Sequence, residues 1–173
     1  MTLHSRLPHA LIVAGVVVLD QLSKALLQRS LELHDSRPLI EGLLALSHVR
    51  NRGAAFGILS DAGLRYQGEI LSAVSLAALL AIAVYAWRLP AEARLPRLAL
   101  ALVLGGAVGN LIDRLRFGYV VDFIHLYWKQ HSWPDFNLAD SAISAGVVLL
   151  LYDMVRPTRR AEPAPEPVTG RSE

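Results

Sequence analysis

The sequence contains no cysteine among its 173 residues, and only 18% of them are charged. The absence of cysteine excludes disulfides, thiolate metal sites and a cysteine nucleophile. A soluble domain of this size carries about a quarter charged residues, so water does not solvate the whole surface. The net charge is only +2, with basic residues spread along the chain, which argues against nucleic acid as a partner. With 53% hydrophobic residues, the composition predicts a small membrane protein.

Four apolar stretches are candidate membrane spans, at about residues 10–28, 68–87, 96–113 and 137–155. Within the second, residues 70–87 are eighteen consecutive uncharged residues, enough for a full span as a helix. The other three carry polar residues near an end, as expected of a small bundle with a site at its edge. The first stretch lacks a small-residue cleavage signal, which favours a retained helix over a signal peptide.

We therefore expect an all-α integral membrane protein in which residues 1–156 form a single four-helix domain. The composition of residues 157–173, rich in Pro, Ala and Glu, predicts a disordered tail. Lys and Arg are equally numerous on the two sides of such a bundle. On the side of the termini they lie in shorter segments near the helix ends, where the positive-inside effect acts. This favours cytoplasmic termini and two exported loops.

The two exported loops contain strand-like segments. In the first loop, residues 44–49 resemble a strand and residues 51–57 resemble a glycine-punctuated turn and return strand. In the second loop, residues 119–124 are rich in Val and aromatic residues, which favours another short strand. We expect the loops to pair as a small β-sheet over the helix ends. In the third span, the G-x-x-x-G spacing at residues 105–109 predicts close packing of that helix.

Acidic side chains at membrane depth cost about 2.5–3.5 kcal/mol each at a helix centre, so each one needs a physical explanation. Four aspartates lie near the ends of apolar stretches: Asp20, Asp113, Asp122 and Asp140. For Asp20, an ion pair with Lys24 one helical turn later is the simplest explanation. Asp113 adjoins Arg114, which cannot face it on a helix, so its partner must come from elsewhere. A carboxylate is the expected partner of Arg114.

Asp122 and Asp140 are harder to explain as structural residues, because neither has a Lys or Arg within four residues. Apolar surroundings raise the pKa of a carboxylic acid, and two neighbouring carboxylates cannot easily both ionise. Such a pair shares a proton. One carboxylate can then take a proton from water while the other protonates a carbonyl oxygen. The pair therefore suggests aspartic hydrolysis.

Other chemistries fit the sequence less well. Lys24 and Lys129 are the only lysines; Ser23 points away from its neighbour Lys24, and there is no G-x-S-x-G motif. The six histidines form no H-E-x-x-H motif, so a metal site is not expected. Two further alternatives are a transport subunit, in which the aspartates bind ions, and a structural scaffold. Strand-forming loops beside the aspartates disfavour the first, and two unpaired aspartates disfavour the second.

Five motifs occur in a characteristic order. They are DQLSK at residues 20–24, NRGAAFG at 51–57, GGAVGNLIDR at 105–114, VDFI at 121–124 and FNLADS at 136–141. With these motifs on four apolar spans, the chain up to about residue 156 resembles the lipoprotein signal peptidases, also called signal peptidase II. This bacterial family removes signal peptides from prolipoproteins that carry a diacylglyceryl group, cutting just before the lipidated cysteine.

The resemblance implies that Asp122 and Asp140 are the catalytic pair that activates water. It implies supporting or substrate-contacting roles for Asp20, Lys24, Asn51, Gly53, Asn110, Arg114, Asn137 and Ala139. It also implies a sheet-like cradle with a flexible flap, no metal or other cofactor, and globomycin as an inhibitor that occupies the pair. The expected partners are diacylglyceryl-modified prolipoproteins and membrane lipid. We expect a monomer in the bacterial inner membrane, with its site near the outer face.

Overall fold

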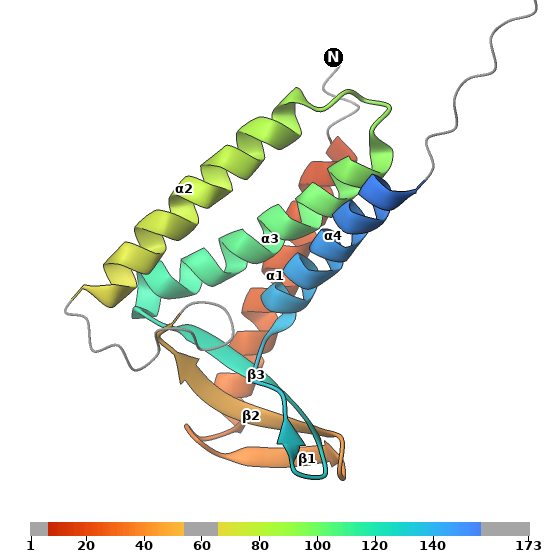
Figure 1. The fold of residues 1–173 in the computed structure, drawn as a ribbon. Helices are drawn as coiled ribbons and strands as arrows, with labels where there is room; N and C mark the ends of the chain where they lie inside the picture. Colours follow the sequence, from red (N-terminus) through yellow and green to blue (C-terminus); the bar gives the residue numbers. More distant parts are fainter. Residues whose placement is uncertain (1–6, 54–65, 157–173) are drawn as a thin grey trace, which may run out of the picture.

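The computed structural model describes residues 7–53 and 66–156 (Figure 1). The elements in chain order are α1 (Leu7–Ser30), β1 (Ser36–Ile40), β2 (Leu44–Asn51), α2 (Gln67–Arg88), α3 (Arg94–Phe117), β3 (Val120–Trp128), β4 (His131–Ser132) and α4 (Leu138–Val155). All four helices are long and apolar enough to cross a membrane. The predicted architecture of four membrane helices with a small sheet is therefore confirmed. The single-domain assignment stays a prediction, and the predicted tail, residues 157–173, lies outside the described residues.

Helix α3 is the centre of the bundle. It packs against α1, α2 and α4, and 56% of its most apolar segment is buried inside the protein. None of the corresponding segment of α2 is buried. A helix that is apolar all round yet not buried inside the protein is typical of a membrane span, so most of the surface of α2 is suited to contact with lipid.

Two glycines let α3 approach its neighbours closely. A Cβ atom on Gly105 would lie 2.7 Å from the Cβ of Val16 on α1. A Cβ atom on Gly106 would lie only 2.3 Å from the backbone oxygen of Ala139 on α4. Both distances are shorter than a normal contact between non-bonded atoms. The predicted close packing of the third helix through small residues is confirmed.

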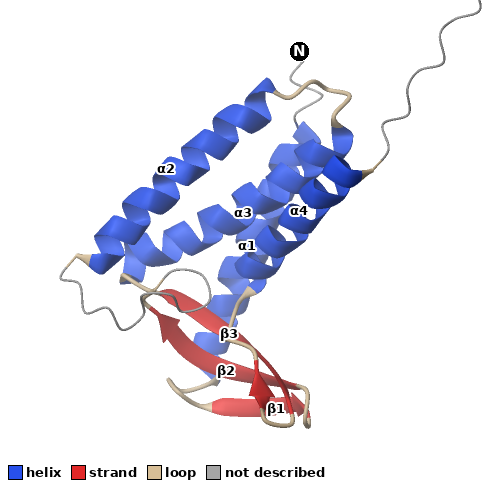
Figure 2. Cartoon of the chain, viewed as in Figure 1, coloured by secondary structure: helices blue, strands red, loops and turns tan. Residues whose placement is uncertain are grey.

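The four strands form one antiparallel sheet in the order β1-β2-β3-β4. Strands β1 and β2 come from the first loop and β3 and β4 from the second, so the predicted pairing of the two loops is confirmed. Figure 2 shows the sheet at one end of the bundle, away from the end where α1 begins and α4 ends. The predicted flap and return strand fall mostly on residues 54–57, outside the described residues.

A small apolar cluster attaches the sheet to the bundle. Leu27 near the end of α1 packs with Val121 and Phe123 of β3, and all three are buried. Val121 and Phe123 are two residues apart, so they lie on one face of the strand. Asp122 between them points to the other face. The strand alternation therefore presents this carboxyl group toward the start of α4.

Candidate active site

Asn137 links the two aspartates that the sequence suggests as a catalytic pair. Its side-chain Nδ2 donates a hydrogen bond of 2.7 Å to Asp122 Oδ1 on β3. Its backbone N–H donates one of 3.2 Å to Asp140 Oδ2 in the first turn of α4. Asn137 also caps α4, because its Oδ1 accepts the backbone N–H of Asp140 at 3.0 Å. The start of a helix thus fixes both carboxyl groups around one fully buried amide.

Asp122 is 2% exposed. Its Oδ2 accepts a hydrogen bond of 2.9 Å from Asn51 Nδ2 at the end of β2, and Asn51 in turn accepts the backbone N–H of Gly53. Burial, followed by the negative charge of Asp140, raises the pKa of Asp122 to about 7. Hydrogen bonds from Asn51 and Asn137 and the charge of Lys24 act in the opposite direction but are outweighed. Asp122 therefore keeps its proton up to about neutral pH.

Asn110 of α3 is a second hydrogen-bond donor to Asp140, in addition to the backbone of Asn137. Its Nδ2 donates to Asp140 Oδ1 at 2.8 Å. Its Oδ1 accepts from Lys24 Nζ at 3.0 Å and from Asn137 Nδ2 at 3.2 Å. Two donors at the oxygen leave only one orientation for this amide, with its nitrogen toward Asp140.

A buried ion cluster lies beneath this amide. Lys24 Nζ is 2.8 Å from Asp20 Oδ2 and 2.9 Å from Asp113 Oδ2, and the three side chains are at most 3% exposed. The predicted pairing of Asp20 with Lys24 is confirmed. The prediction that Asp113 finds its partner elsewhere in the chain is also confirmed, because Lys24 lies on α1 and Asp113 on α3.

Asp20 and Asp113 also accept hydrogen bonds from the backbone next to the candidate pair. Asp20 Oδ1 accepts the N–H of Ala139, the residue before Asp140, at 3.0 Å. Asp113 Oδ2 accepts the N–H of Val121, which precedes Asp122, at 3.1 Å. The ion cluster therefore joins α1 and α3 to the two backbone segments that carry the pair.

Arg114 does not have the carboxylate contact that the sequence suggested. Its guanidinium donates to two backbone oxygens, that of Asn110 at 3.5 Å and that of Gly53 at 3.3 Å, and in the described part of the chain it forms no ion pair. The physical reason is that the nearby carboxyl groups have other partners: Asp113 pairs with Lys24, and amides donate to the oxygens of Asp122 and Asp140. Arg114 instead connects the end of α3 to the backbone that follows β2.

Residues 12–156 match the family model described as Signal peptidase (SPase) II. The chain belongs to the signal peptidase II family. The lipoprotein signal peptidase of Geobacter sulfurreducens is 49% identical over 152 residues, covering 88% of this chain and 94% of that protein. That of Acinetobacter baumannii is 45% identical over 152 residues and covers 84% of each chain.

Two solved structures share the fold of this chain. Their titles describe bacterial membrane enzyme structures determined by the in meso method at 1.9 Å and 2.3 Å resolution. Each is 32% identical in sequence; the TM-scores are 0.74 and 0.76, covering 87% and 90% of this chain and 94% of each structure. The protein is therefore a bacterial membrane peptidase, and the similarity covers both the bundle and the sheet.

Gln21 and the second contact of Asp113 were not predicted from the sequence. Gln21 Nε2 donates to Asp113 Oδ1 at 2.8 Å, to the backbone oxygen of Gly109 at 3.2 Å and to Asp20 Oδ2 at 3.2 Å. A usable signal was present, because Asp20, Gln21 and Lys24 interrupt an apolar run at positions that share one side of a helix. Their partners on α3 become visible only when the helices are packed.

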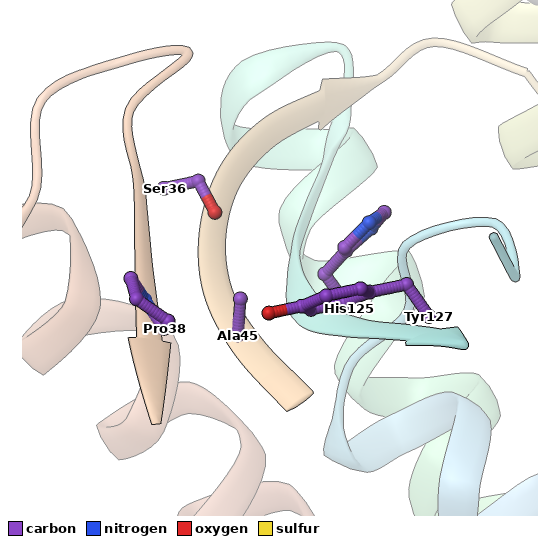
Figure 3. A pocket seen from close by; sticks show the side chains of 5 residues that line it. All are labelled: Ser36, Pro38, Ala45, His125 and Tyr127. Atoms are coloured by element: carbon purple, nitrogen blue, oxygen red, sulfur yellow. The ribbon is translucent and has the colours of Figure 1, made fainter. Parts of the chain in front are cut away.

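A shallow hollow of about 260 Å³ lies on the sheet and is separate from the candidate pair. Figure 3 shows Tyr127 of β3 reaching toward Ala45 of β2, with Pro38 on the opposite wall. Tyr127 and Asp122 differ by an odd number of residues along β3, so they point to opposite faces. Elsewhere in residues 7–53 and 66–156, no three His, Cys, Asp or Glu side chains lie together as a metal site would require.

Proposed function

We propose that the protein removes signal peptides from diacylglyceryl-modified prolipoproteins by cutting just before the lipidated cysteine, with Asp122 and Asp140 as its catalytic pair. The observation that carries this proposal is the set of hydrogen bonds from Asn137 to both carboxyl groups. The name shared by the relatives, lipoprotein signal peptidase, supports the substrate class. An apolar bundle with its polar site at one end suits a substrate that is anchored in lipid.

In the proposed reaction, Asp122 begins with the shared proton and Asp140 begins as the base. Water attacks the scissile carbonyl carbon, Asp140 takes a proton from the water, and Asp122 gives its proton to the carbonyl oxygen. The tetrahedral intermediate then collapses. The C–N bond breaks, the leaving amine takes the proton from Asp140, and Asp122 recovers its proton from the hydroxyl group. The pair returns to its starting state and uses one water molecule.

Substitution of either aspartate tests the proposed catalytic pair. Asp122→Asn and Asp140→Asn each remove one proton-transfer group, so cleavage of a diacylated prolipoprotein in detergent should fall at least about 10²-fold. Substrate binding should persist. Asp153→Asn is the matched control, because Asp153 lies near the opposite end of α4 and pairs with Arg156. Cleavage near the wild-type rate by either active-site variant rejects the pair.

In this proposed function, the protein recognises its substrate mainly through the lipid. Each buried methylene contributes about 0.8 kcal/mol to membrane anchoring, so two acyl chains hold the substrate at the bilayer more strongly than a short peptide contact. The enzyme then has to align only the backbone beside Asp122 and Asp140. An unlipidated precursor with an intact cleavage sequence should lose most of its cleavage in the same detergent. Equal rates for the two precursors would assign recognition to the peptide.

We also propose that the protein is a monomer in the inner membrane, with cytoplasmic termini and a site near the outer face that globomycin occupies. The even number of helices supports a common side for the two ends, and Figure 1 shows the sheet at the other end of the bundle. Because the chain has no cysteine, single cysteines can report the orientation. In intact cells an impermeant maleimide should label Gln130→Cys beside β4 and leave Glu92→Cys, between α2 and α3, unlabelled.

A further inference from the structure

A polar cluster outside the candidate active site joins three strands of the sheet. His125 Nδ1 on β3 lies 3.2 Å from Asp135 Oδ1, and His125 Nε2 lies 3.2 Å from Ser132 Oγ on β4. Ser47 on β2 donates its hydroxyl to the same Asp135 oxygen. The carboxyl group of Asp135 is 23% exposed and the His125 ring 27%. Asp135 itself belongs to the segment that leads from the sheet to α4.

Phe136 and Asn137, the two residues after Asp135, connect this cluster to the proposed catalytic pair. The backbone of Phe136 is fixed on β3, because its N–H donates to Ile124 at 3.1 Å and its oxygen accepts the N–H of Ile124 at 2.8 Å. Asn137 follows and donates to Asp122 and Asp140. Three consecutive residues are thus held in turn by a side-chain cluster, by the sheet backbone and by the candidate active site.

We infer that Asp135 is a positioning residue for catalysis: through Ser47 and His125 it holds the segment before α4 so that Asn137 reaches both carboxyl groups. This inference rests on the proposed function. Ser47 and Ser132 lie on different strands, so the cluster fixes the segment to the sheet as a whole. Without Asp135, the segment before Asn137 keeps its backbone hydrogen bonds to β3, through Phe136 and Trp133, but loses the side-chain link to Ser47 on β2.

A loosened segment affects chemistry before it affects substrate binding. A misplacement of about 1 Å in an active site can lower a rate by about 10²-fold, and Asn137 approaches Asp122 to within 2.7 Å. The hydrogen bond from Asn137 also lowers the pKa of Asp122 against the effect of burial. The charged groups that act on Asp122 from the packed helices are Asp140 on α4 and Lys24 on α1. Lengthening this bond therefore raises the pKa of Asp122 further.

The test compares Asp135→Ala with the isosteric Asp135→Asn in the full-length protein, by cleavage of a diacylated prolipoprotein in detergent. Asp135→Ala should lower kcat by about tenfold, a fraction of the loss for a full misplacement, with little change in KM. The high-pH limb of its activity profile should move to higher pH. Asp135→Asn keeps an acceptor for Ser47 and should retain most of the wild-type kcat. Glu41→Ala, in the exposed turn between β1 and β2, is the control.

Ser47→Ala provides a second variant that removes one bond and keeps Asp135. It should show a smaller loss of kcat with the same direction of pH shift. A wild-type kcat and pH profile for Asp135→Ala overturns the inference, even if its melting temperature falls. Equal losses for Asp135→Asn and Asp135→Ala also overturn it. Asp122→Asn in the same assay separates the two proposals: if it cleaves normally the proposed function fails, and if it is inactive while Asp135→Ala is normal only the positioning role fails.

Discussion

Asp20 and Asp113 hold corresponding places on the two sides of the candidate pair. Asp20 accepts the backbone N–H of the residue before Asp140, and Asp113 accepts that of the residue before Asp122. Both acids lie within 2.9 Å of the same Lys24 nitrogen. One buried cation therefore stabilises the two acids that hold the backbone beside the proposed catalytic pair, which explains why three charged side chains are tolerated inside an apolar bundle.

Replacing Lys24 should destabilise the fold strongly. Lys24→Met leaves Asp20 and Asp113 as two buried carboxyl groups around an apolar side chain, and loss of one partner of a buried ion pair costs about 3–5 kcal/mol. Thermal unfolding in detergent should show a large fall in melting temperature and cleavage should be lost. Lys129→Met, in the exposed turn after β3, should unfold like the wild type. The double variant Lys24→Met with Asp113→Asn should recover part of the loss, and no recovery would argue against charge as the cause.

Close packing of α3 against α4 gives a second prediction. In Gly106→Ala the new methyl group meets the backbone oxygen of Ala139 at 2.3 Å, and a backbone atom cannot swing aside as a side chain can. The start of α4 must shift, and the carboxyl group of Asp140 shifts with it. We expect both melting temperature and cleavage to fall. Gly15→Ala on α1, where a Cβ atom meets nothing within 4 Å, is the matched control, and an equal effect of the two changes would contradict the packing argument.

The sequence predicts those features that depend on local spacing. Asp20 and Lys24 are four residues apart on an apolar helix, so their contact follows from helix geometry. Asp122 and Asp140 are conspicuous because no cation is near them in sequence. The strands at residues 44–49 and 119–124 follow from their composition and alternation.

Contacts between residues that lie far apart in the sequence cannot be predicted from local spacing. The approach of Asp113 to Lys24 depends on how α1 and α3 pack, and that packing depends on glycines whose partners are not visible in the sequence. The expected ion pair of Arg114 with a carboxylate was wrong for the same reason, since Asp113 pairs with Lys24 from another helix. His125 lies on β3 and Asp135 in the segment before α4, ten residues apart, so no local spacing in the sequence indicated their contact.

The raised pKa of Asp122 predicts how activity depends on pH. With a pKa of about 7, Asp122 loses the proton that the proposed reaction requires as pH rises through about 7, so kcat/KM should decline on the alkaline side. The hydrogen bond from Asn51 lowers this pKa. Asn51→Ala should therefore move the alkaline limb to higher pH while it lowers the maximal rate. A pH series of kcat/KM for both proteins measures the shift, and a shift toward lower pH would contradict this role of Asn51.

The raised pKa of Asp122 should also make the free energy of unfolding depend on pH. The direction is opposite to that for an aspartate whose pKa is lowered by an ion pair. An aspartate in an unfolded chain has a pKa of about 3.9, whereas that of Asp122 in the folded protein is about 7. Between these values the folded state holds a proton that the unfolded state has released. The free energy of unfolding therefore decreases as pH rises through this interval. The stabilisation is fully present below the unfolded pKa and is lost above the folded pKa.

Asp122→Asn has no proton to release, so it should remove this dependence. At about pH 5 Asp122 is neutral, and the variant should be no more stable than the wild type. The amide that replaces the carboxyl group has only one oxygen, so it cannot accept hydrogen bonds from both Asn51 and Asn137. At about pH 8 the wild type carries the unfavourable buried charge, and the variant should gain in relative melting temperature while remaining inactive. Thermal unfolding of both proteins across this range, with Asp153→Asn alongside, measures the difference. A difference that stays constant with pH would mean that Asp122 does not titrate in this interval.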